Sequence, residues 1–474
     1  MPVSASNLVA WGVQCLQRGD RTSALINFEQ ALWLQPNYPE ALLWRGVAHL
    51  ELGNLAQALT DLNLVISALP HDPRAYYYRG QIYRQQNETI RAIADYRQAV
   101  VLQPDWLIPY SPLSELLFAA GNYSELIPYL ETLEKAGAGS DTLYYQLGCA
   151  YRYTNQIGKA VAYLRRIPHH EPAQKELKEI YRQKVMDWHF PMMNDAVRNQ
   201  AFDQALRQLV QPHMTVLDIG AGSGLLSMQA VRAGAKQVFT CEMEPIIADI
   251  AQKIIAKNGY SDRIHLFQRD SRTLKVPEDL PHRANLLVTE TFGSWLFSEG
   301  CLGTIVHARE HLLQPDAPII PCSAVIYLAL VEVPQLYQRF WVHHASGFDL
   351  SPFNEISPFL VTAFVGQIDT FSPRWLSAPY PLPAIDFQTC PPEFTEMTVA
   401  IPVTTSGTLH AICSWFDLYL TPEIVITTHP DQSLAHNATC WGQWTRAFPT
   451  PLEVTAGAIV KVQVTEHDVW LHPL

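Results

Sequence analysis

Paired cysteines, long apolar runs and metal-ligand motifs are missing from this sequence. The eight cysteines of the 474-residue chain are spread along it, and none forms a C-x-x-C pair. This spacing disfavours a zinc site or a disulfide framework and predicts reduced thiols in the cytoplasm. No apolar run approaches the ~18 residues of a membrane span, and no basic segment precedes an apolar start, so we expect no membrane contact. Without an H-E-x-x-H motif or a similar spacing, we expect no metal.

Charge is also scarce, and basic charge especially so. Charged residues make up 16% of the chain, and the net charge is -12. Proteins that bind nucleic acid need a basic face to displace counterions, so we expect no nucleic-acid partner. The balance favours basic partners. A hydrophobic content of 48% is enough for large cores, and the length predicts two to four domains.

The first third of the chain repeats itself every 34 residues. Glycines, alanines and prolines recur at this period, and Phe28, Leu62 and Tyr96 keep the same step. A period of 34 with small residues facing large ones is typical of tetratricopeptide repeats, in which two helices pack as a pair. The glycines are Gly12, Gly46 and Gly80, the alanines Ala24, Ala58 and Ala92, and the prolines Pro36, Pro70 and Pro104.

About five such repeats are expected between Ala5 and about Gln174, and the fourth is blurred because Ser114 replaces the glycine. A solenoid of this kind offers a groove, so we predict a protein partner bound through the repeats. The alternative is that the solenoid only braces the next domain or a dimer. The charged segment 175–187 is predicted to be a linker helix, or else the capping helix of the solenoid.

From Thr215 the pattern changes to alternating strands and helices, which predicts a doubly wound α/β domain. A glycine-rich turn follows the first strand, with Gly220 and Gly222 in a G-x-G-x-G arrangement, and Glu242 ends the second strand. A dinucleotide fingerprint would need glycine at Leu225. The turn therefore favours an uncharged nucleoside ligand, with Glu242 accepting hydrogen bonds from ribose hydroxyls. A nicotinamide-binding domain is the alternative.

Two acids flank the aromatic loop after the fourth strand. Glu290 and Glu299 lie in TETFGSWLFSEG, at the carboxyl edge of the predicted sheet, where ligands bind in such folds. Two carboxylates that converge on one point suit a planar guanidinium, which remains charged and pairs through two donors. The alternative is a pair of solvated loop residues.

These motifs together resemble the protein arginine methyltransferase family, over roughly Trp188 to Leu474. The segments are VLDIGAGSGLLS, the Glu290/Glu299 pair and EGCLGTIVHAREHLL, while WHFPMMNDAVRN is most similar to the type 9 members and next to the type 7 members. The repeats match the type 9 architecture, although those relatives carry two catalytic modules. The resemblance implies S-adenosyl-L-methionine as cofactor, an arginine-containing protein substrate and a possible homodimer.

The family's roles carry over by position. Glu290 and Glu299 would be catalytic and clamp the substrate guanidinium. The cofactor would contact Arg198, Asp218, Gly220, Gly222, Glu242, Ser271, Thr304 and Met192, with Arg198 pairing with its carboxylate. The substrate side would be formed by His189, Met193, Trp441 and Cys440.

The last part of the chain shows alternating β-branched runs, which predict a β domain. The resemblance implies that this domain is a β-barrel that forms the other wall of the substrate cleft. Cys440 stands where the family's Thr-His-Trp loop has histidine, so substrate acceptance is open. Trp441 is expected to offer an aromatic face to the guanidinium, or else to lie in the barrel core. A proline-rich stretch near 343–382 is predicted to be a dimerisation arm or a surface loop.

The expected fold is therefore multidomain. An all-α tetratricopeptide solenoid (1–174) and a linker helix (175–187) precede an α/β doubly wound S-adenosylmethionine-binding domain (188–318) and a β-barrel domain (319–474). We expect an arginine methyltransferase. A small-molecule methyltransferase and a catalytically inactive scaffold that binds through its repeats remain open as alternatives.

Overall fold

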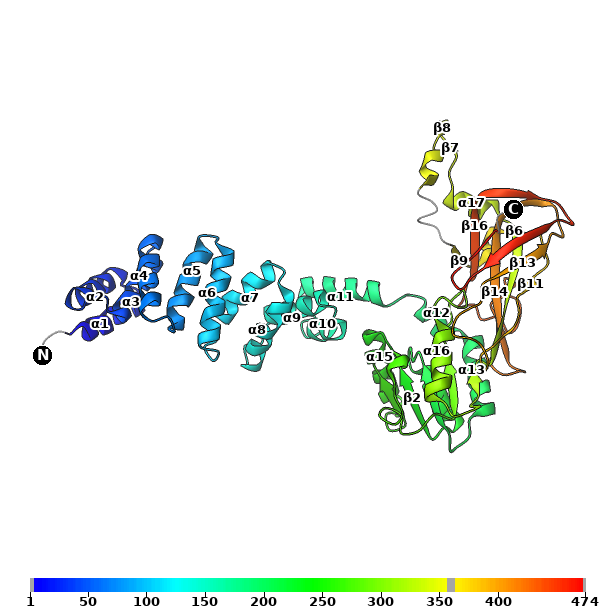
Figure 1. Ribbon diagram of the computed structural model, residues 1–474, viewed down its shortest axis with the longest axis horizontal. Coiled ribbons are helices and arrows are strands. Elements are labelled where there is room, and N and C mark those ends of the chain that lie inside the picture. Colours follow the sequence, from blue (N-terminus) through cyan, green and yellow to red (C-terminus); the bar gives the residue numbers. More distant parts are fainter. Residues whose placement is uncertain (1–3, 356–362, 472–474) are drawn as a thin grey trace. The chain divides into compact units, whose positions relative to one another are not determined.

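The computed structural model describes residues 4–355 and 363–471. It divides into two compact units, Met1–Arg182 and Gln183–Leu474 (Figure 1). The first unit is helical, and the second combines a parallel sheet flanked by helices with antiparallel sheets. Within the described ranges, the helices are too short or too polar to cross a membrane.

The first unit is a row of helix pairs, as the 34-residue period predicts. Each helix contacts its partner and the next helix along the chain. The pairs are α1 (Ala5–Gln17) with α2 (Arg21–Leu34), α3 (Pro39–Glu51) with α4 (Leu55–Ala68), α5 (Pro73–Gln85) with α6 (Thr89–Leu102), α7 (Tyr110–Ala119) with α8 (Tyr123–Lys135), and α9 (Asp141–Tyr153) with α10 (Ile157–Leu164).

The repeated glycines allow the two helices of a pair to touch. A Cβ atom at Gly12 would lie 2.3 Å from the Phe28 ring, and one at Gly148 would lie 2.5 Å from Leu164. Phe28 and Leu164 are fully buried, so neither ring nor side chain has room to retreat. Ser114, whose side chain is also small, occupies this position in the fourth pair and is likewise buried.

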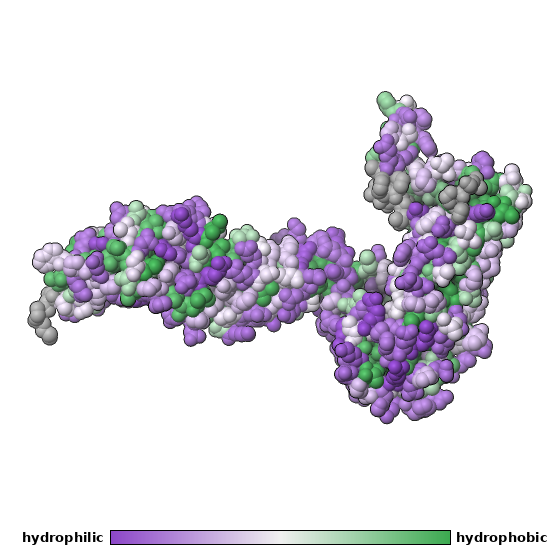
Figure 2. Space-filling model, viewed as in Figure 1, coloured by the Kyte–Doolittle hydropathy of each residue, from purple (hydrophilic) through white to green (hydrophobic). Residues whose placement is uncertain are grey.

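Helix α11 (Glu171–Lys184) packs as the last helix of the solenoid. Ala173, Leu177 and Ile180 lie on its buried face, and Arg152 of α9 forms a salt bridge with Glu176. The helix begins earlier than the predicted linker, 175–187, and its contacts are those of a capping helix. Figure 2 shows apolar patches on the surface of the first unit. The exposed apolar side chains of this unit include Trp33, Ile90 and Val101.

The second unit opens with α12 (His189–Asn194) and α13 (Ala196–Leu209), followed by a five-stranded parallel sheet in the order β3-β2-β1-β4-β5. Strand β1 has β2 on one side and β4 on the other, so the winding reverses there and a ligand crevice is expected beyond the strand ends. The strands are β1 (Thr215–Ile219), β2 (Gln237–Cys241), β3 (Ile264–Phe267), β4 (Leu286–Thr289) and β5 (Ile319–Ile320); the helices and helical turns are α14 (Leu225–Ala233), α15 (Pro245–Lys257), η1 (Ser271–Thr273), α16 (Cys301–His307) and η2 (Ala308–Leu312).

Antiparallel sheets form the rest of the second unit, as the alternating runs predict. The larger sheet follows β10-β6-β14-β16-β9, with β11 and β12 on β6 and β15 on β14, and the smaller one follows β13-β17-β18. Helix α17 (Pro334–Phe340) follows β6. The strands are β6 (Ser323–Glu332), β9 (Phe364–Gly366), β10 (Arg374–Trp375), β11 (Tyr380–Pro381), β12 (Ile385–Asp386), β13 (Met397–Pro402), β14 (Gly407–Tyr419), β15 (Val425–Thr427), β16 (Gln443–Val454), β17 (Ile459–Val464) and β18 (Val469–Leu471).

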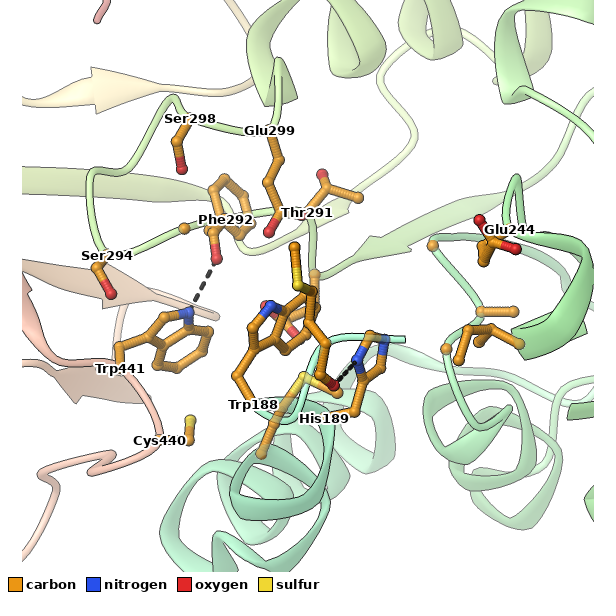
Figure 3. Close-up of a pocket in the computed structure, with 18 of the residues that line it drawn as sticks. Trp188, His189, Glu244, Thr291, Phe292, Ser294, Ser298, Glu299, Cys440 and Trp441 are labelled. Atoms are coloured by element: carbon orange, nitrogen blue, oxygen red, sulfur yellow. Dashed lines mark hydrogen bonds between the residues drawn. The ribbon is translucent and has the colours of Figure 1, made fainter. Parts of the chain in front are cut away.

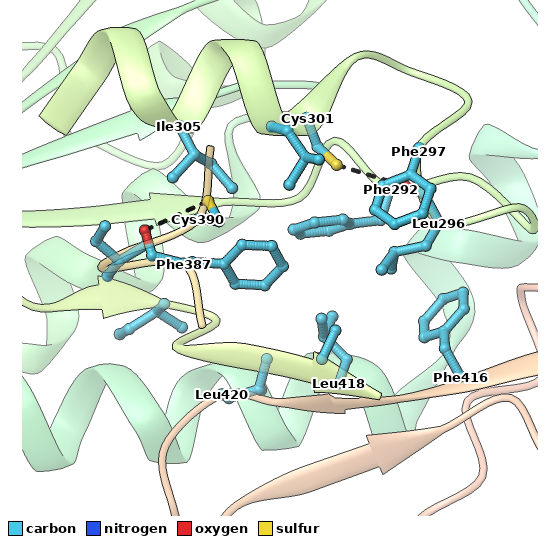
Figure 4. Packing of buried hydrophobic residues seen from close by; sticks show 14 of the residues in the cluster. Phe292, Leu296, Phe297, Cys301, Ile305, Phe387, Cys390, Phe416, Leu418 and Leu420 are labelled. Atoms are coloured by element: carbon cyan, nitrogen blue, oxygen red, sulfur yellow. Dashed lines mark hydrogen bonds between the residues drawn. The ribbon is translucent and has the colours of Figure 1, made fainter. Parts of the chain in front are cut away.

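One apolar core joins the α/β part to the antiparallel part. Phe292, in the loop after β4, packs against Phe387 with ring centroids 5.5 Å apart, and Phe416 and Leu418 of β14 belong to the same cluster (Figure 4). Strand β5 pairs with β4 in the parallel sheet and therefore falls just beyond the predicted boundary at 318. Its two residues are too few for a periodic signal.

The predicted dimerisation arm near 343–382 lies partly outside the described residues, which omit 356–362. In the described part, β7 (His344–Ala345) and β8 (Phe348–Asp349) form a small hairpin before η3 (Ser351–Glu355). The stretch from β9 through η4 (Ile368–Phe371) to β11 belongs to the larger sheet or its connections. The predicted range therefore contains both a protruding hairpin and part of the β domain.

Candidate active site

A cavity of about 1100 Å³ lies beyond the carboxyl ends of β1, β2 and β4, at the reversal point of the sheet. Residues of α12 and α13 and of the loops after these strands form part of its wall, and loops of the antiparallel part complete it (Figure 3). In the described part of the chain, no group of three or more His, Cys, Asp or Glu side chains is placed to hold a metal ion.

Two glycines in the turn after β1 leave the backbone bare at the cavity. Gly220 and Gly222 have φ angles of +84° and +52°, and a Cβ atom at Gly220 would lie 2.9 Å from Thr291. The backbone N–H of Gly222 donates to Glu242 at 3.0 Å, and that of Glu244 donates to the other Glu242 oxygen at 2.9 Å. The Glu242 carboxylate is thereby fixed at the cavity wall with lone pairs left to accept further hydrogen bonds.

Asp218 lies beneath this turn and not at the cavity, which corrects its predicted place among the cofactor contacts. The Ser227 hydroxyl of α14 donates to it at 2.5 Å, and burial raises the pKa of the carboxyl to about 7. Side chains alternate along a strand, and Asp218 of β1 points toward α14. Its observed contact ties the strand to the helix that follows the glycine turn.

Arg198 and Glu290 form a buried ion pair at the cavity. Arg198 of α13 donates to Glu290 at 2.5 Å, and the two side chains are 4% and 7% exposed. Burial raises the pKa of the Glu290 carboxyl, and the Arg198 charge opposes that rise. Arg198 Nε has no hydrogen-bond partner among the described residues, so one cationic donor remains for an anionic group.

Glu299 precedes α16 and extends into the same cavity (Figure 3). Among the described residues it forms no salt bridge. Burial raises the pKa of this carboxyl to about 7, and the nearby charges of Glu290 and Glu242 add to the rise. The two carboxylates that the sequence predicts to converge thus face one cavity and repel each other, and a bound cation would relieve this repulsion.

Helix α12 contributes His189, Met192 and Met193 to the cavity wall. Figure 3 shows His189 on the side of the cavity opposite Glu299. The Trp188 ring stacks on His189 with centroids 4.0 Å apart. The imidazole Nδ1 of His189 lies 2.9 Å from the carbonyl oxygen of Met186, which fixes the ring orientation.

Asp195 connects two walls of the cavity. One carboxylate oxygen accepts the backbone N–H of Arg198 at 2.9 Å and caps α13, and the other accepts the backbone N–H of Cys440 at 3.0 Å. Burial, reinforced by the Asp195 charge, raises the pKa of the Cys440 thiol far above its ordinary value. The thiol therefore remains protonated near neutral pH and is no substitute for a histidine base.

Trp441 lines the cavity but lies mostly in the core. Its indole N–H donates to the carbonyl oxygen of Phe292 at 2.8 Å (Figure 3). Its ring packs edge-on to Phe416. The residue is 7% exposed. The side-chain amide of Gln367 donates to the Trp441 carbonyl oxygen at 3.3 Å, which holds the loop from the other side. Of the two roles predicted for Trp441, these contacts favour a place in the core over an aromatic face for the guanidinium.

All predicted site residues except Asp218 therefore meet at one cavity. Sequence reasoning missed Trp188, Asp195 and Gln367. Trp188 directly precedes His189, and Asp195 directly precedes α13, where aspartate is a preferred cap, so both had a local signal. Gln367 had none. The cavity collects Glu290, Glu299, Arg198, Gly220, Gly222, Glu242, Ser271, Thr304, Met192, His189, Met193, Trp441 and Cys440.

Three family models match the chain in the order of its parts. Residues 43–181 match the tetratricopeptide repeat, and residues 203–290 match the ribosomal protein L11 methyltransferase. Residues 322–471 match the arginine methyltransferase oligomerization subdomain. The predicted succession of repeats, methyltransferase sheet and β domain is thereby confirmed.

Two curated proteins and one solved structure show how similar the chain is to known proteins. The chain is 36% identical over 293 residues to the arginine N(omega)-methyltransferase of Streptomyces achromogenes subsp. streptozoticus, which covers 62% of this chain and 80% of that protein. It is 31% identical over 342 residues to protein arginine N-methyltransferase 9 of Xenopus laevis, covering 63% of this chain and 40% of that longer protein.

The solved structure is the Trypanosoma brucei PRMT1 enzyme–prozyme heterotetrameric complex with AdoHcy. It matches at a TM-score of 0.51 and 24% identity, over 58% of this chain and 86% of that chain. This match supports the fold of the second unit. With the Streptomyces relative covered over most of its length, the chain belongs to the arginine N-methyltransferase family.

Proposed function

We propose that this protein transfers a methyl group from S-adenosyl-L-methionine to a guanidino nitrogen of arginine in a protein substrate. The observation that carries the proposal is the placing of Glu290 and Glu299 in one cavity, beside a glycine turn and an acid suited to a ribose. Two carboxylates facing one space match the charge and the forked donors of a guanidinium.

The residues at the glycine turn fit S-adenosyl-L-methionine, which supplies a methyl group activated by its sulfonium. Gly220 and Gly222 leave the backbone bare where a Cβ atom would meet Thr291. The free Nε donor of Arg198 would bind the methionine carboxylate, Glu242 would accept from ribose hydroxyls, and Ser271 and Thr304 would line the adenine side. The donor set needs no metal.

The two carboxylates have different tasks in this proposal. Glu290, already paired with Arg198, holds one edge of the guanidinium, and Glu299 holds the other. Together they draw positive charge away from the attacking nitrogen and leave electron density on it. Glu299 accepts the proton released as the product forms, because its pKa of about 7 matches the neutral range. The Cys440 thiol cannot accept this proton, because it is already protonated.

The relatives support arginine as the substrate. The name of the Streptomyces protein specifies arginine, and that of the Xenopus protein specifies protein arginine. We also propose that the repeats recruit the substrate or a partner, and that two copies assemble through the β domain, since that part matches an oligomerization subdomain. The eight free cysteines support a location in the reducing cytoplasm.

A methyl-transfer assay with labelled cofactor tests the proposal. The acceptors are an arginine-rich peptide, its lysine-substituted counterpart and free arginine, and mass spectrometry identifies each product. We expect methylarginine in the arginine peptide and none in the lysine peptide. Transfer to free arginine alone would support a small-molecule enzyme instead. Cofactor binding without transfer to any acceptor, including the proteins of a cell lysate, would favour the inactive scaffold.

A further inference from the structure

A second cavity, of about 470 Å³, lies in the β domain and shares no lining residue with the first. Two tryptophans, Trp375 of β10 and Trp415 of β14, form its aromatic wall, and we call it the Trp375 cavity. The rest of the lining comprises Ala329, Asp369, Pro373, Ser377, Pro379, His429, Pro430 and Asp431.

The two indole rings are held at a fixed angle. The Trp375 and Trp415 rings meet edge to face at 71°, with centroids 6.1 Å apart. Tyr327 stacks on Trp415 at 5.8 Å and 12°, and His429 meets the same ring edge-on at 5.1 Å. Trp415 is 3% exposed, so its ring cannot turn away. Because Trp415 is itself almost fully buried, a cation entering the cavity would meet mainly the half-buried Trp375 ring, which Trp415 holds in place.

The charge of this cavity is negative. Asp369 and Asp431 are both exposed at its rim, and the described residues that line it include no lysine or arginine. In the described part of the chain neither carboxylate forms a salt bridge. The hydroxyl and backbone N–H of Ser433 donate to Asp431 and hold the pKa of its carboxyl below the usual range. Burial lowers the pKa of His429, so its ring is neutral near pH 7 and does not offset the acids.

We propose that the Trp375 cavity binds the guanidinium of a second arginine side chain in the polypeptide substrate. A guanidinium is planar, stacks on indole faces and offers paired donors to carboxylates, whereas a lysine ammonium is a strongly hydrated point charge. The choice of ligand follows from the cavity. That the bound guanidinium belongs to the substrate polypeptide rests on the proposed function. A substrate rich in arginine would thus be held at two places on the second unit.

The test uses the full chain labelled with fluorotryptophan and titrated with N-acetyl-arginine amide. The fluorine resonance of Trp375 is assigned because it disappears in the Trp375→Phe variant. The resonance of Trp415 is assigned because it shifts in the same variant, in which the neighbouring ring is replaced. We expect both to move saturably. The double variant Asp369→Asn/Asp431→Asn should weaken binding about tenfold, because two exposed carboxylates are lost. Asp262→Asn, an exposed aspartate outside both cavities, should leave it unchanged.

The same titration of the Glu299→Gln variant separates the two proposals. The Trp375 and Trp415 shifts should persist there, whatever becomes of methyl transfer. Three outcomes overturn the inference: resonances that do not move, undiminished binding in the Asp369→Asn/Asp431→Asn variant, or N-acetyl-lysine amide binding as tightly as the arginine probe. None of these outcomes depends on whether the first cavity catalyses methylation.

Discussion

The contacts of the repeat unit join residues close in the sequence, whereas those of the catalytic cavity join residues far apart. Arg45 and Asp61, which pair across one helix pair, are 16 residues apart. Asp195 and Cys440, which link two walls of the cavity, are 245 residues apart. A solenoid is stable through neighbouring repeats, so damage there should remain local. The cavity depends on the whole second unit.

The two units also differ in charge. The repeat unit carries 16 Lys and Arg against 17 Asp and Glu, and the second unit carries 17 against 28, so nearly all of the net charge of -12 lies in the second unit. A field of one sign raises the local concentration of oppositely charged ligands. The charge difference therefore favours the second unit as the part that attracts the proposed arginine-rich substrate.

The largest difference between the two units is expected when one glycine of each is replaced by alanine. Gly220→Ala should weaken S-adenosyl-L-methionine binding by about 100-fold or more, because residue 220 has φ +84° and the new Cβ would lie 2.9 Å from Thr291. Gly46→Ala in the repeats places its Cβ 3.1 Å from Leu62 in ordinary helical geometry. It should leave cofactor binding unchanged. Isothermal titration of both variants measures the contrast, and equal losses would contradict it.

Two helix-capping aspartates give the next comparison. Asp195→Ala removes the cap of α13 and the bond to Cys440, so methyl transfer should fall about tenfold. Asp20→Ala removes a cap of α2 in the repeats, where its carboxylate accepts the Ser23 N–H at 3.0 Å. It should lower the stability of that helix without affecting transfer to a short peptide. Kinetics and thermal unfolding are measured on both variants, and unchanged transfer in Asp195→Ala would rule out the linking role.

The pH dependence should come from the catalytic unit alone. Because the pKa of Glu299 is raised to about 7, the carboxyl becomes neutral as the pH falls through this value and no longer attracts a guanidinium. We expect kcat/KM to fall about fivefold between pH 7 and pH 6. Asp20→Ala should keep this acidic limb. A flat profile between these pH values in the parent protein would remove Glu299 as the titrating group.

The smallest effect on activity is expected from a buried ion pair of the repeats. Asp95→Asn weakens the pair with Arg79, which spans 2.8 Å, and should destabilise the α5/α6 pair by about 1–3 kcal/mol. Hydrogen exchange should then rise in α5 and α6 and little elsewhere, while transfer to a short arginine peptide stays unchanged. Loss of that transfer would mean that damage in the repeat unit reaches the second unit, which contradicts stability through neighbouring repeats alone.

These contrasts explain how much the sequence could reveal. The spacing of Gly12 and Gly148 from their bulky partners is periodic, so the repeats and their packing were predictable without a structure. The glycine turn and Glu242 were predictable because one strand–turn–helix unit determines them. The convergence of Glu290 and Glu299 was predictable, since both residues lie in one loop after a strand.

What the sequence could not reveal depends on distant contacts or on the direction of a side chain. Asp218 sits within the motif, and only the fold shows that it points toward α14. The pairing of Arg198 with Glu290 joins residues 92 apart, and the link between Gln367 and Trp441 joins residues 74 apart. Neither has a local signal, and the ends of short strands such as β5 have none either.

Methyl transfer by the Glu299→Gln variant tests the central claim most directly, with cofactor affinity measured on the same sample. The amide keeps the size of the side chain but removes the charge that is proposed to hold the guanidinium and accept its proton. We expect transfer to an arginine peptide to fall by about 10³-fold while cofactor affinity remains within about twofold. Transfer within about tenfold of the parent protein would contradict it.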